Sequence, residues 1–382
     1  MDRLTRFDEP LPETTPPDPA DWGSLSAPEV LAPLLGRRFA CPACGAVHVL
    51  RTRRIETSET ALARSGELLE GMGFAGQPVV LFDTRTYAAC GPALTDGLAR
   101  FSPRPMILQG DDLHADERLV GSLLIAMSDD PPFLVSCGSG CLTDTTRYVA
   151  LRCRLPFVSV ATAASMDGYA SSNTPLIVGG FKISYPGKAP EAILSDPRVL
   201  AKAPRAMTAA GFGDVLAKIV ALLDWKLARD LEGESYCPLV ADLVDKAVGE
   251  CLALAGDLAG GSPSAVARLL DVLSLTGVAM QMMGTSRPAS GAEHHISHLL
   301  EMRDIQRGRH GSLHGDKVGI GTLVSMAMYL RMFGDGALPA QRPTLPAAAW
   351  EREVRRVYGP LADEAIAKNA PEPPSEIGRA HV

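Results

Sequence analysis

Short apolar runs separated by helical stretches form the clearest pattern between residues 75 and 200. Each run is bounded by Pro or Gly, and segments with apolar residues at helical spacing, such as 117–127, lie between them. Strands buried on both faces are apolar throughout, which is typical of a parallel sheet covered by helices. We therefore predict an α/β domain over residues 23–200, with a hairpin near its start. Its strands are expected at 79–82, 106–108, 133–135, 157–160 and 192–194.

After about residue 200 the strand-like runs almost vanish, and Gly and Pro separate longer helical segments. This pattern predicts an all-helical second domain over residues 201–370. Its helices are expected at 214–232, 241–258, 264–283, 291–303, 317–333 and 347–367.

Two terminal segments are expected to lie outside these domains. Residues 1–22 hold five prolines among acidic residues and threonines, which predicts a flexible tail. Residues 371–382 end in EIGRAHV, which resembles a sequencing adapter translated in frame, so we expect a disordered, artefactual tail.

Composition narrows the class of protein. The chain has 382 residues, 46% hydrophobic and 21% charged, which suits a globular protein of two domains. A net charge of -7 argues against nucleic-acid partners. The N-terminus has no apolar core of a signal peptide, and Arg268 and Asp271 interrupt the most apolar later stretch, so we expect no membrane span and a cytoplasmic location. Eight scattered cysteines fit reduced thiols.

Five of the eight histidines lie between residues 294 and 314. His294 and His298 stand four residues apart, so on a helix they share one face and reach the same cavity. This clustering indicates a catalytic metal site. A site with an open position needs three protein ligands, which makes Asp214 a candidate beside His294 and His314, although an aspartate that merely caps a helix is equally compatible.

Glycines and small hydroxyl residues predict a cofactor crevice. Gly138, Ser139 and Gly140 follow a predicted strand and precede a helix, where backbone N–H groups can approach a pyrophosphate. The motif alone is weak, because the third glycine of the dinucleotide fingerprint is absent. Asp83 ends an earlier strand and could accept from a ribose hydroxyl, or simply form a turn. The loop at 161–172 places small hydroxyl residues around Asp167.

A second cluster, Cys41-Pro-Ala-Cys44 followed by His48, looks like one knuckle of a zinc ribbon. No second CxxC supplies further ligands, which favours a metal-free hairpin turn.

Five motifs together resemble the sn-glycerol-1-phosphate dehydrogenases over residues 40–335. They are GSG through Asp144, SMDGYAS from Ser165, GFGD ending at Asp214, SRPASGAEH from Ser286 and HGDK from His314. That family is related to metal-dependent glycerol dehydrogenases and 3-dehydroquinate synthases. The resemblance implies the dehydroquinate synthase-like, iron-type alcohol dehydrogenase fold, in which a Rossmann-like nucleotide-binding domain precedes an all-helical metal-binding domain. Residues 173–175 and Cys141 depart from the family pattern.

The resemblance also implies roles for single residues. Asp214, His294 and His314 would hold zinc or nickel, while Asp167 and His298 would contact the substrate. The residues expected to contact NAD(P)H are Gly138, Ser139, Gly140, Asp144, Thr162, Ser165 and Ser171, with Asp83 expected at the ribose.

The implied reaction is reduction of dihydroxyacetone phosphate to sn-glycerol 1-phosphate, in a homo-oligomer with a dimer favoured. Hydride arrival makes an alkoxide that takes a proton, from His298 or Asp167. Arg287 and Lys317 are candidates to bind the phosphate, although either could equally be a structural ion-pair partner.

Three alternatives differ in chemistry. A glycerol or other polyol dehydrogenase would use the same site, a 3-dehydroquinate synthase-like lyase would use the same fold with NAD, and a non-catalytic metal-binding module would retain metal but bind no cofactor.

Overall fold

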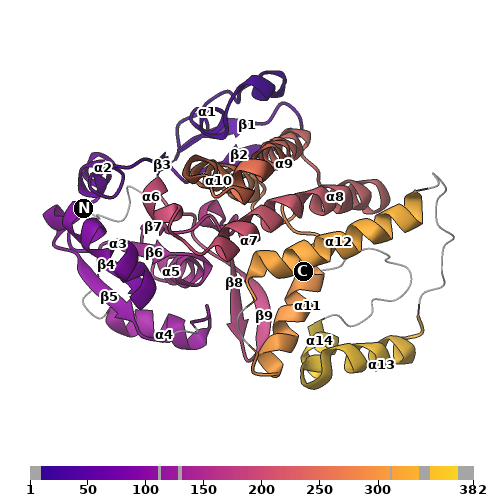
Figure 1. Ribbon diagram of the computed structural model, residues 1–382. Coiled ribbons are helices and arrows are strands. Elements are labelled where there is room, and N and C mark those ends of the chain that lie inside the picture. The colour runs from indigo at the N-terminus through magenta and orange to yellow at the C-terminus, as the bar shows by residue number, and fades with distance from the viewer. Residues whose placement is uncertain (1–9, 111–112, 128–130, 310–311, 335–344, 369–382) are drawn as a thin grey trace.

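The computed structural model describes residues 10–110, 113–127, 131–309, 312–334 and 345–368. A sheet flanked by helices forms one part of the molecule, and a group of longer helices forms the other (Figure 1). The predicted tail at 371–382 lies outside the described residues.

The sheet has six parallel strands in the order β3-β10-β7-β6-β4-β5. The five predicted strands are confirmed, and their bounds are β4 (Val79–Asp83), β5 (Arg104–Leu108), β6 (Leu134–Gly138), β7 (Phe157–Ala161) and β10 (Ala192–Ser195). The pattern missed the edge strand β3 (Arg54–Thr57), because its RIET sequence is half exposed and lacks an apolar run.

Side chains of each strand alternate between two cores, as period-two geometry requires. On β4, Val80 and Phe82 join a core that includes Leu94, whereas Val79 and Leu81 join a second core with Leu123. The helices around the sheet are α2 (Ser65–Gly71), α3 (Thr84–Gly97), α4 (Glu117–Ala126), α5 (Gly140–Arg152) and the short α6 (Pro197–Leu200). The strands are therefore apolar because both faces are covered.

The helical part confirms the prediction of a second, strand-poor region. It comprises α7 (Arg205–Leu216), α8 (Lys218–Glu232), α9 (Pro238–Ala259), α10 (Pro263–Met283), α11 (Ala292–Gln306), α12 (His314–Phe333), α13 (Ala347–Tyr358), a 3-10 turn η5 (Gly359–Leu361) and α14 (Ala362–Lys368). The single helix predicted at 214–232 is wrong: Ala217 separates α7 from α8, and Asp214 lies inside α7.

Two helical stretches, Arg205–Glu232 and Pro263–Met283, are long and apolar enough to cross a membrane. Their apolar windows are 50% and 78% buried within the fold, as is common for core helices. The expected absence of a membrane span stays a prediction.

The N-terminal residues contradict two expectations. Residues 10–22 were expected in a flexible tail, yet Trp22 is 3% exposed in the 3-10 helix η2 (Pro19–Ser24), and Thr14 N–H donates to Arg38 O at 3.0 Å. The hairpin of β1 (Arg38–Ala40) and β2 (Val47–Val49) was expected in the α/β domain. Together with η2 and α1 (Ala27–Leu31), it packs against α9 and α10 instead (Figure 1). Buried Trp22, Phe39 and Leu50 share one core with these helices, which explains both results.

A second hairpin was missed at residues 173–186. Its strands β8 (Asn173–Val178) and β9 (Phe181–Pro186) are joined by Gly179 and Gly180, whose φ angles are 58° and 82°. A two-residue turn with both φ angles positive is the tight hairpin connection that glycine favours, so Gly-Gly was the usable signal. The hairpin lies beside α5 and α11 (Figure 1). Its residues Asn173 and Lys182 line the cavity described below.

Candidate active site

A cavity of about 370 Å³ lies where the carboxyl ends of the strands meet the helical part. This edge of a parallel sheet is where ligands bind in open α/β folds. The cavity brings together residues that are distant in sequence, including Ser139, Asp144, Asp167, Ser171, Lys182, His294, His298, Glu301 and His314.

Asp214, His294 and His314 converge at one end of the site. One ligand atom of each lies within 4.8 Å of the others. α7 carries Asp214, α11 carries His294, and α12 begins at His314. Asp214 is fully buried within α7, so it does not cap a helix.

Hydrogen bonds orient these groups for ligation. Glu293 Oε1 lies 2.7 Å from His294 Nδ1, which leaves Nε2 facing Asp214 Oδ1 at 3.8 Å. Such an outer carboxylate fixes the tautomer of a ligating histidine. The buried Nδ1 of His314 has no hydrogen-bond partner among the described residues. An orphaned imidazole nitrogen beside a carboxylate and a second imidazole suits a divalent metal.

Electrostatics keep these groups in the protonation states that metal binding needs. Burial and the nearby Lys182 lower the pKa of His314 to about 3, so its imidazole is neutral at pH 7. Burial opposes ionisation of Asp214, but Lys218 and the two histidines hold its pKa below the ordinary value. The site therefore offers the carboxylate of Asp214 and the neutral imidazole of His314.

The sequence analysis missed Lys218, which is fully buried at the start of α8. Its Nζ lies 2.8 Å from Asp214 Oδ1 and 2.8 Å from Asp167 Oδ2. Asp167 N–H donates to Asp214 Oδ2 at 3.0 Å, so the two carboxylates are held side by side. Burial and the facing Asp214 raise the pKa of Asp167, against the effect of Lys218. Lys218 thus pairs with two adjacent buried carboxylates and compensates one of their two negative charges.

The substrate side of the cavity carries His298, Lys182 and Glu301. The ring centroid of His298 lies 6.2 Å from that of His294 and 6.2 Å from that of His314. Burial, followed by Lys182, lowers the pKa of His298 well below its ordinary value. Lys182 Nζ lies 2.6 Å from Glu301 Oε2, and the buried Nδ2 of Asn173 has no partner among the described residues. His298 therefore lines the cavity as a neutral imidazole, beside an ammonium and a free amide donor.

The N-terminus of α5 forms the other end of the cavity. Ser139 Oγ lies 2.6 Å from Ser165 Oγ, and a Cβ on Gly140 would stand 3.3 Å from Met166 Sδ. Thr162 N–H donates to Gly138 O at 3.3 Å, which joins the ends of two neighbouring strands. These residues come together as the sequence predicted, and Ser139, Gly140, Ser165 and Ser171 line the cavity.

Arg147, fully buried on α5, organises the loops around this end of the cavity. It donates to Asp144 Oδ1 at 2.6 Å, to Asn173 O at 3.1 Å and to Tyr169 O at 3.2 Å. Burial raises the pKa of Asp144 to about 6, although Arg147 opposes the shift. A buried arginine between two loops carries no local sequence signal, so the pattern could not reveal it.

Several predicted residues lie outside the cavity lining. Asp83 ends β4, where its carboxylate accepts from Thr86 N–H at 2.7 Å and caps α3. Arg287 forms a double hydrogen bond with Glu234 at 2.6 and 2.7 Å, and Lys317 donates to Ser312 O at 3.0 Å. Neither Arg287 nor Lys317 lines the cavity, and Arg287 takes the alternative role of a structural ion-pair partner. Among the described cavity-lining residues, Lys182 is the one lysine or arginine.

Known proteins share this fold. The structure is similar to that of a glycerol dehydrogenase from Schizosaccharomyces pombe, with a TM-score of 0.60, 19% identity, and coverage of 81% of this chain and 83% of that chain. The model of the iron-containing alcohol dehydrogenase family matches residues 56–204. The fold is therefore that of iron-type alcohol dehydrogenases, as predicted.

Two curated relatives are more similar in sequence. A glycerol-1-phosphate dehydrogenase [NAD(P)+] from Geobacillus thermodenitrificans is 38% identical over 72% of this chain and 70% of its own length. An enzyme of the same name from Bacillus licheniformis is 34% identical over 84% of this chain and 79% of its own length. The chain belongs to the glycerol-1-phosphate dehydrogenase family.

Proposed function

We propose that this protein reduces dihydroxyacetone phosphate to sn-glycerol 1-phosphate with NAD(P)H, at a divalent metal held by Asp214, His294 and His314. The observation that carries the proposal is one cavity with these ligand groups at one end, the glycine-rich start of α5 at the other and Lys182 in its wall. The family to which the chain belongs supports the same reaction.

The ligand set suits the metal that such a reduction uses. One carboxylate and two imidazoles leave a position open for substrate, and they suit zinc or nickel among first-row metals. When bound, the metal supplies a Lewis acid that polarises the ketone oxygen. Glu293 and Lys218 orient the ligands, because each contacts one of them from outside.

The cofactor would bind at the carboxyl edge of the sheet. Backbone N–H groups at the start of α5 would face the pyrophosphate, with Gly138 and Gly140 allowing close approach. The carboxylate of Asp83, on the neighbouring strand β4, would accept a hydrogen bond from a ribose hydroxyl of the cofactor. The other residues proposed to contact NAD(P)H are Ser139, Asp144, Thr162, Ser165 and Ser171.

Substrate recognition would use the β8–β9 hairpin. The Lys182 ammonium and the free amide of Asn173 are donors to phosphate oxygens, and Glu301 holds the lysine in place. Neutral His298 offers one donor and one acceptor nitrogen, so it can hydrogen-bond the substrate or pass a proton to the alkoxide. Asp167 is the second group placed for this proton transfer.

A substrate panel tests the proposal. Metal-loaded protein should oxidise NADH with dihydroxyacetone phosphate at a kcat/KM far above that with dihydroxyacetone, and should act weakly on glycerol with NAD⁺. Lys182→Ala should raise the KM for dihydroxyacetone phosphate roughly 10- to 100-fold, because a charge-assisted hydrogen bond contributes about 1.5–3 kcal/mol. The KM for NADH should not change.

Arg287→Ala is the matched control, since Arg287 pairs with Glu234 away from the cavity. Equal activity on the phosphorylated and unphosphorylated ketones would contradict the proposal and favour a polyol dehydrogenase.

We propose that the protein is a cytoplasmic homo-oligomer, with a dimer favoured. None of the eight cysteines, all of which lie in the described part of the chain, forms a disulfide bond, which suits a reducing compartment. An exposed apolar stripe on α12 supports the proposed oligomer. It consists of Ile320, Leu323, Val324 and Met328, and Leu323 is 71% exposed. A contiguous apolar face of this kind is typical of an interface. Light scattering of the wild type and of Leu323→Glu tests it, since loss of the oligomer is expected in the variant.

A further inference from the structure

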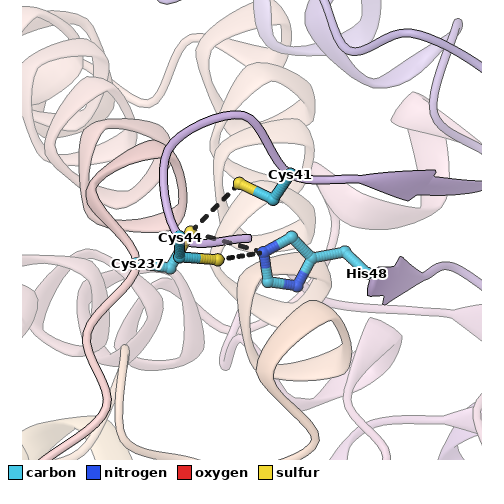
Figure 2. A group of neighbouring side chains, drawn as sticks. All are labelled: Cys41, Cys44, His48 and Cys237. Carbon is cyan, nitrogen blue, oxygen red and sulfur yellow. Dashed lines mark hydrogen bonds between the residues drawn. The ribbon is translucent and has the colours of Figure 1, made fainter. Parts of the chain in front are cut away.

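Three cysteines and one histidine meet far from the catalytic cavity. Cys41, Cys44, Cys237 and His48 each offer a ligand atom, and these four atoms all lie within 4.8 Å of one another. Figure 2 shows the three sulfurs and the His48 ring turned toward a common centre. Cys41, Cys237 and His48 are buried, and Cys44 lies at the surface.

The spacing of these atoms matches the edges of a zinc tetrahedron. Zinc binds sulfur at about 2.3 Å and nitrogen at about 2.0–2.1 Å, which sets tetrahedral S···S and S···N edges of about 3.8 and 3.6 Å. The observed distances are 3.6 Å for Cys41 Sγ to Cys237 Sγ, 3.3 Å for His48 Nε2 to Cys237 Sγ and 3.5 Å for His48 Nε2 to Cys44 Sγ. A disulfide bond needs about 2.05 Å, so the sulfurs of Cys41 and Cys237 are not bonded.

The tautomer of His48 is set for ligation. Its Nδ1 lies 2.9 Å from the carbonyl oxygen of Met282, which can only accept a hydrogen bond. Nδ1 therefore carries the proton, and the free electron pair of Nε2 points at the sulfurs. A ligating histidine usually donates its other N–H in this way.

The backbone around Cys41 has the form of a zinc knuckle. Gly45 takes a φ of 75° and donates its N–H to Cys41 O at 2.9 Å, which closes the turn between β1 and β2. The N–H groups of Ala43 and Cys44 are directed at the Cys41 sulfur. Two cysteines separated by two residues, followed closely by a histidine, then need one further ligand. Cys237, immediately before α9, supplies it from 189 residues beyond His48.

We propose that Cys41, Cys44, His48 and Cys237 bind a structural zinc ion, distinct from the catalytic metal. The sequence favoured a metal-free hairpin turn because no fourth ligand was evident near the other three. The fold provides this ligand, Cys237. Three soft thiolates and one imidazole favour zinc over the harder divalent ions. Each thiol releases its proton to solvent as its sulfur binds, and four protein ligands leave no open position for substrate.

The zinc ion would tie the N-terminal hairpin to the helical part of the molecule. Cys237 precedes α9, and the His48 contact at Met282 lies near the end of α10. Loss of the ion should therefore loosen the packing of the hairpin rather than change the chemistry in the cavity. The inference does not depend on the proposed reaction.

Metal counting and cobalt spectroscopy test the inference. Purified wild-type protein should hold about two metal equivalents by inductively coupled plasma mass spectrometry, one in each site. Cys237→Ser should lose about one, and Cys251→Ser should lose none, because Cys251 lies on the same helix α9 but outside the cluster. His294→Ala should lose the other equivalent.

Cobalt substitution of the wild type gives a readout that requires no variant to fold. A thiolate-to-cobalt charge-transfer band is expected from the proposed site and not from the catalytic ligands, which contain no sulfur. The band should be lost in cobalt-loaded Cys237→Ser. It should persist in His294→Ala. Absence of this band in cobalt-loaded wild-type protein would overturn the proposal, as would a Cys41–Cys237 disulfide in freshly purified protein or an unchanged metal count in folded Cys237→Ser.

Discussion

Replacing Lys218 by Met should destabilise the metal-free protein strongly at neutral pH. Lys218 is fully buried, and its Nζ lies 2.8 Å from both Asp167 and Asp214. Met has a similar shape and no charge, so the substitution removes the charge while largely keeping the packing. The variant leaves two buried carboxylates beside each other without their ammonium.

The expected magnitude follows from this geometry. Removing one partner of a buried ion pair costs about 3–5 kcal/mol, and here one cation serves two carboxylates. Packing contributes little to the difference, so we expect the free energy of unfolding to fall by about 3 kcal/mol or more. Exposed Lys202 provides a matched control, and Lys202→Met should show no measurable change.

The deficit should depend on pH in a defined direction. In the wild type the pKa of Asp214 lies below its ordinary value, so this carboxylate stabilises the fold above its unfolded pKa, and the stabilisation is lost as pH falls through the folded pKa. Without Lys218, burial and mutual repulsion would raise the pKa values of the two aspartates. The loss of unfolding free energy that these two carboxylates cause should then be largest at pH 7–8. It should decrease below about pH 5, as the carboxylates take up protons.

Urea unfolding in the presence of a chelator measures the effect, with fluorescence of the buried Trp225 on α8 reporting on the same part of the molecule. Added zinc or nickel should stabilise the variant more than the wild type, because the metal provides a cation beside Asp214. A variant within 1 kcal/mol of the wild type at pH 7.5, or a deficit that grows on acidification, would refute the reasoning.

Three further predictions concern the site. Loss of any one ligand, in Asp214→Ala, His294→Ala or His314→Ala, should abolish turnover and lower the content of catalytic metal, whereas His295→Ala should do neither. An unchanged metal content in all three ligand variants would show that these residues do not bind the metal. His298→Ala should keep its metal and lose turnover, and stoichiometric loss of metal would make His298 a ligand instead. Asp83→Ala should raise the KM for NADH more than that for NADPH, because a 2′-phosphate is already repelled by this carboxylate; an unchanged ratio of the two KM values would exclude Asp83 from the ribose site.

Local pattern was sufficient for most elements of the fold. The four central strands β4, β6, β7 and β10 were predictable because strands buried on both faces must be apolar throughout, and the edge strand β5 was predictable from its own apolar run, Met106 to Leu108. The edge strand β3 was missed because its half-exposed RIET sequence contains no apolar run. The β8–β9 hairpin was missed although its Gly-Gly turn was a usable local signal. The N-terminal segment was misplaced for a different reason: Trp22 and Phe39 share their core with residues of α9 and α10, which follow them by about 200 residues or more.

Local spacing in the sequence revealed which residue types lie near one another: the histidines one helical turn apart, the glycines after a strand, and the two-cysteine knuckle. Three contacts became visible only in the folded chain: Lys218 joins Asp214 to Asp167, Lys182 rather than Arg287 faces the cavity, and Cys237 meets His48. Periodicity along a helix or strand follows from backbone geometry within a few residues, so a single sequence reveals it. Contacts across 189 residues depend on how whole elements pack, and no local spacing encodes them.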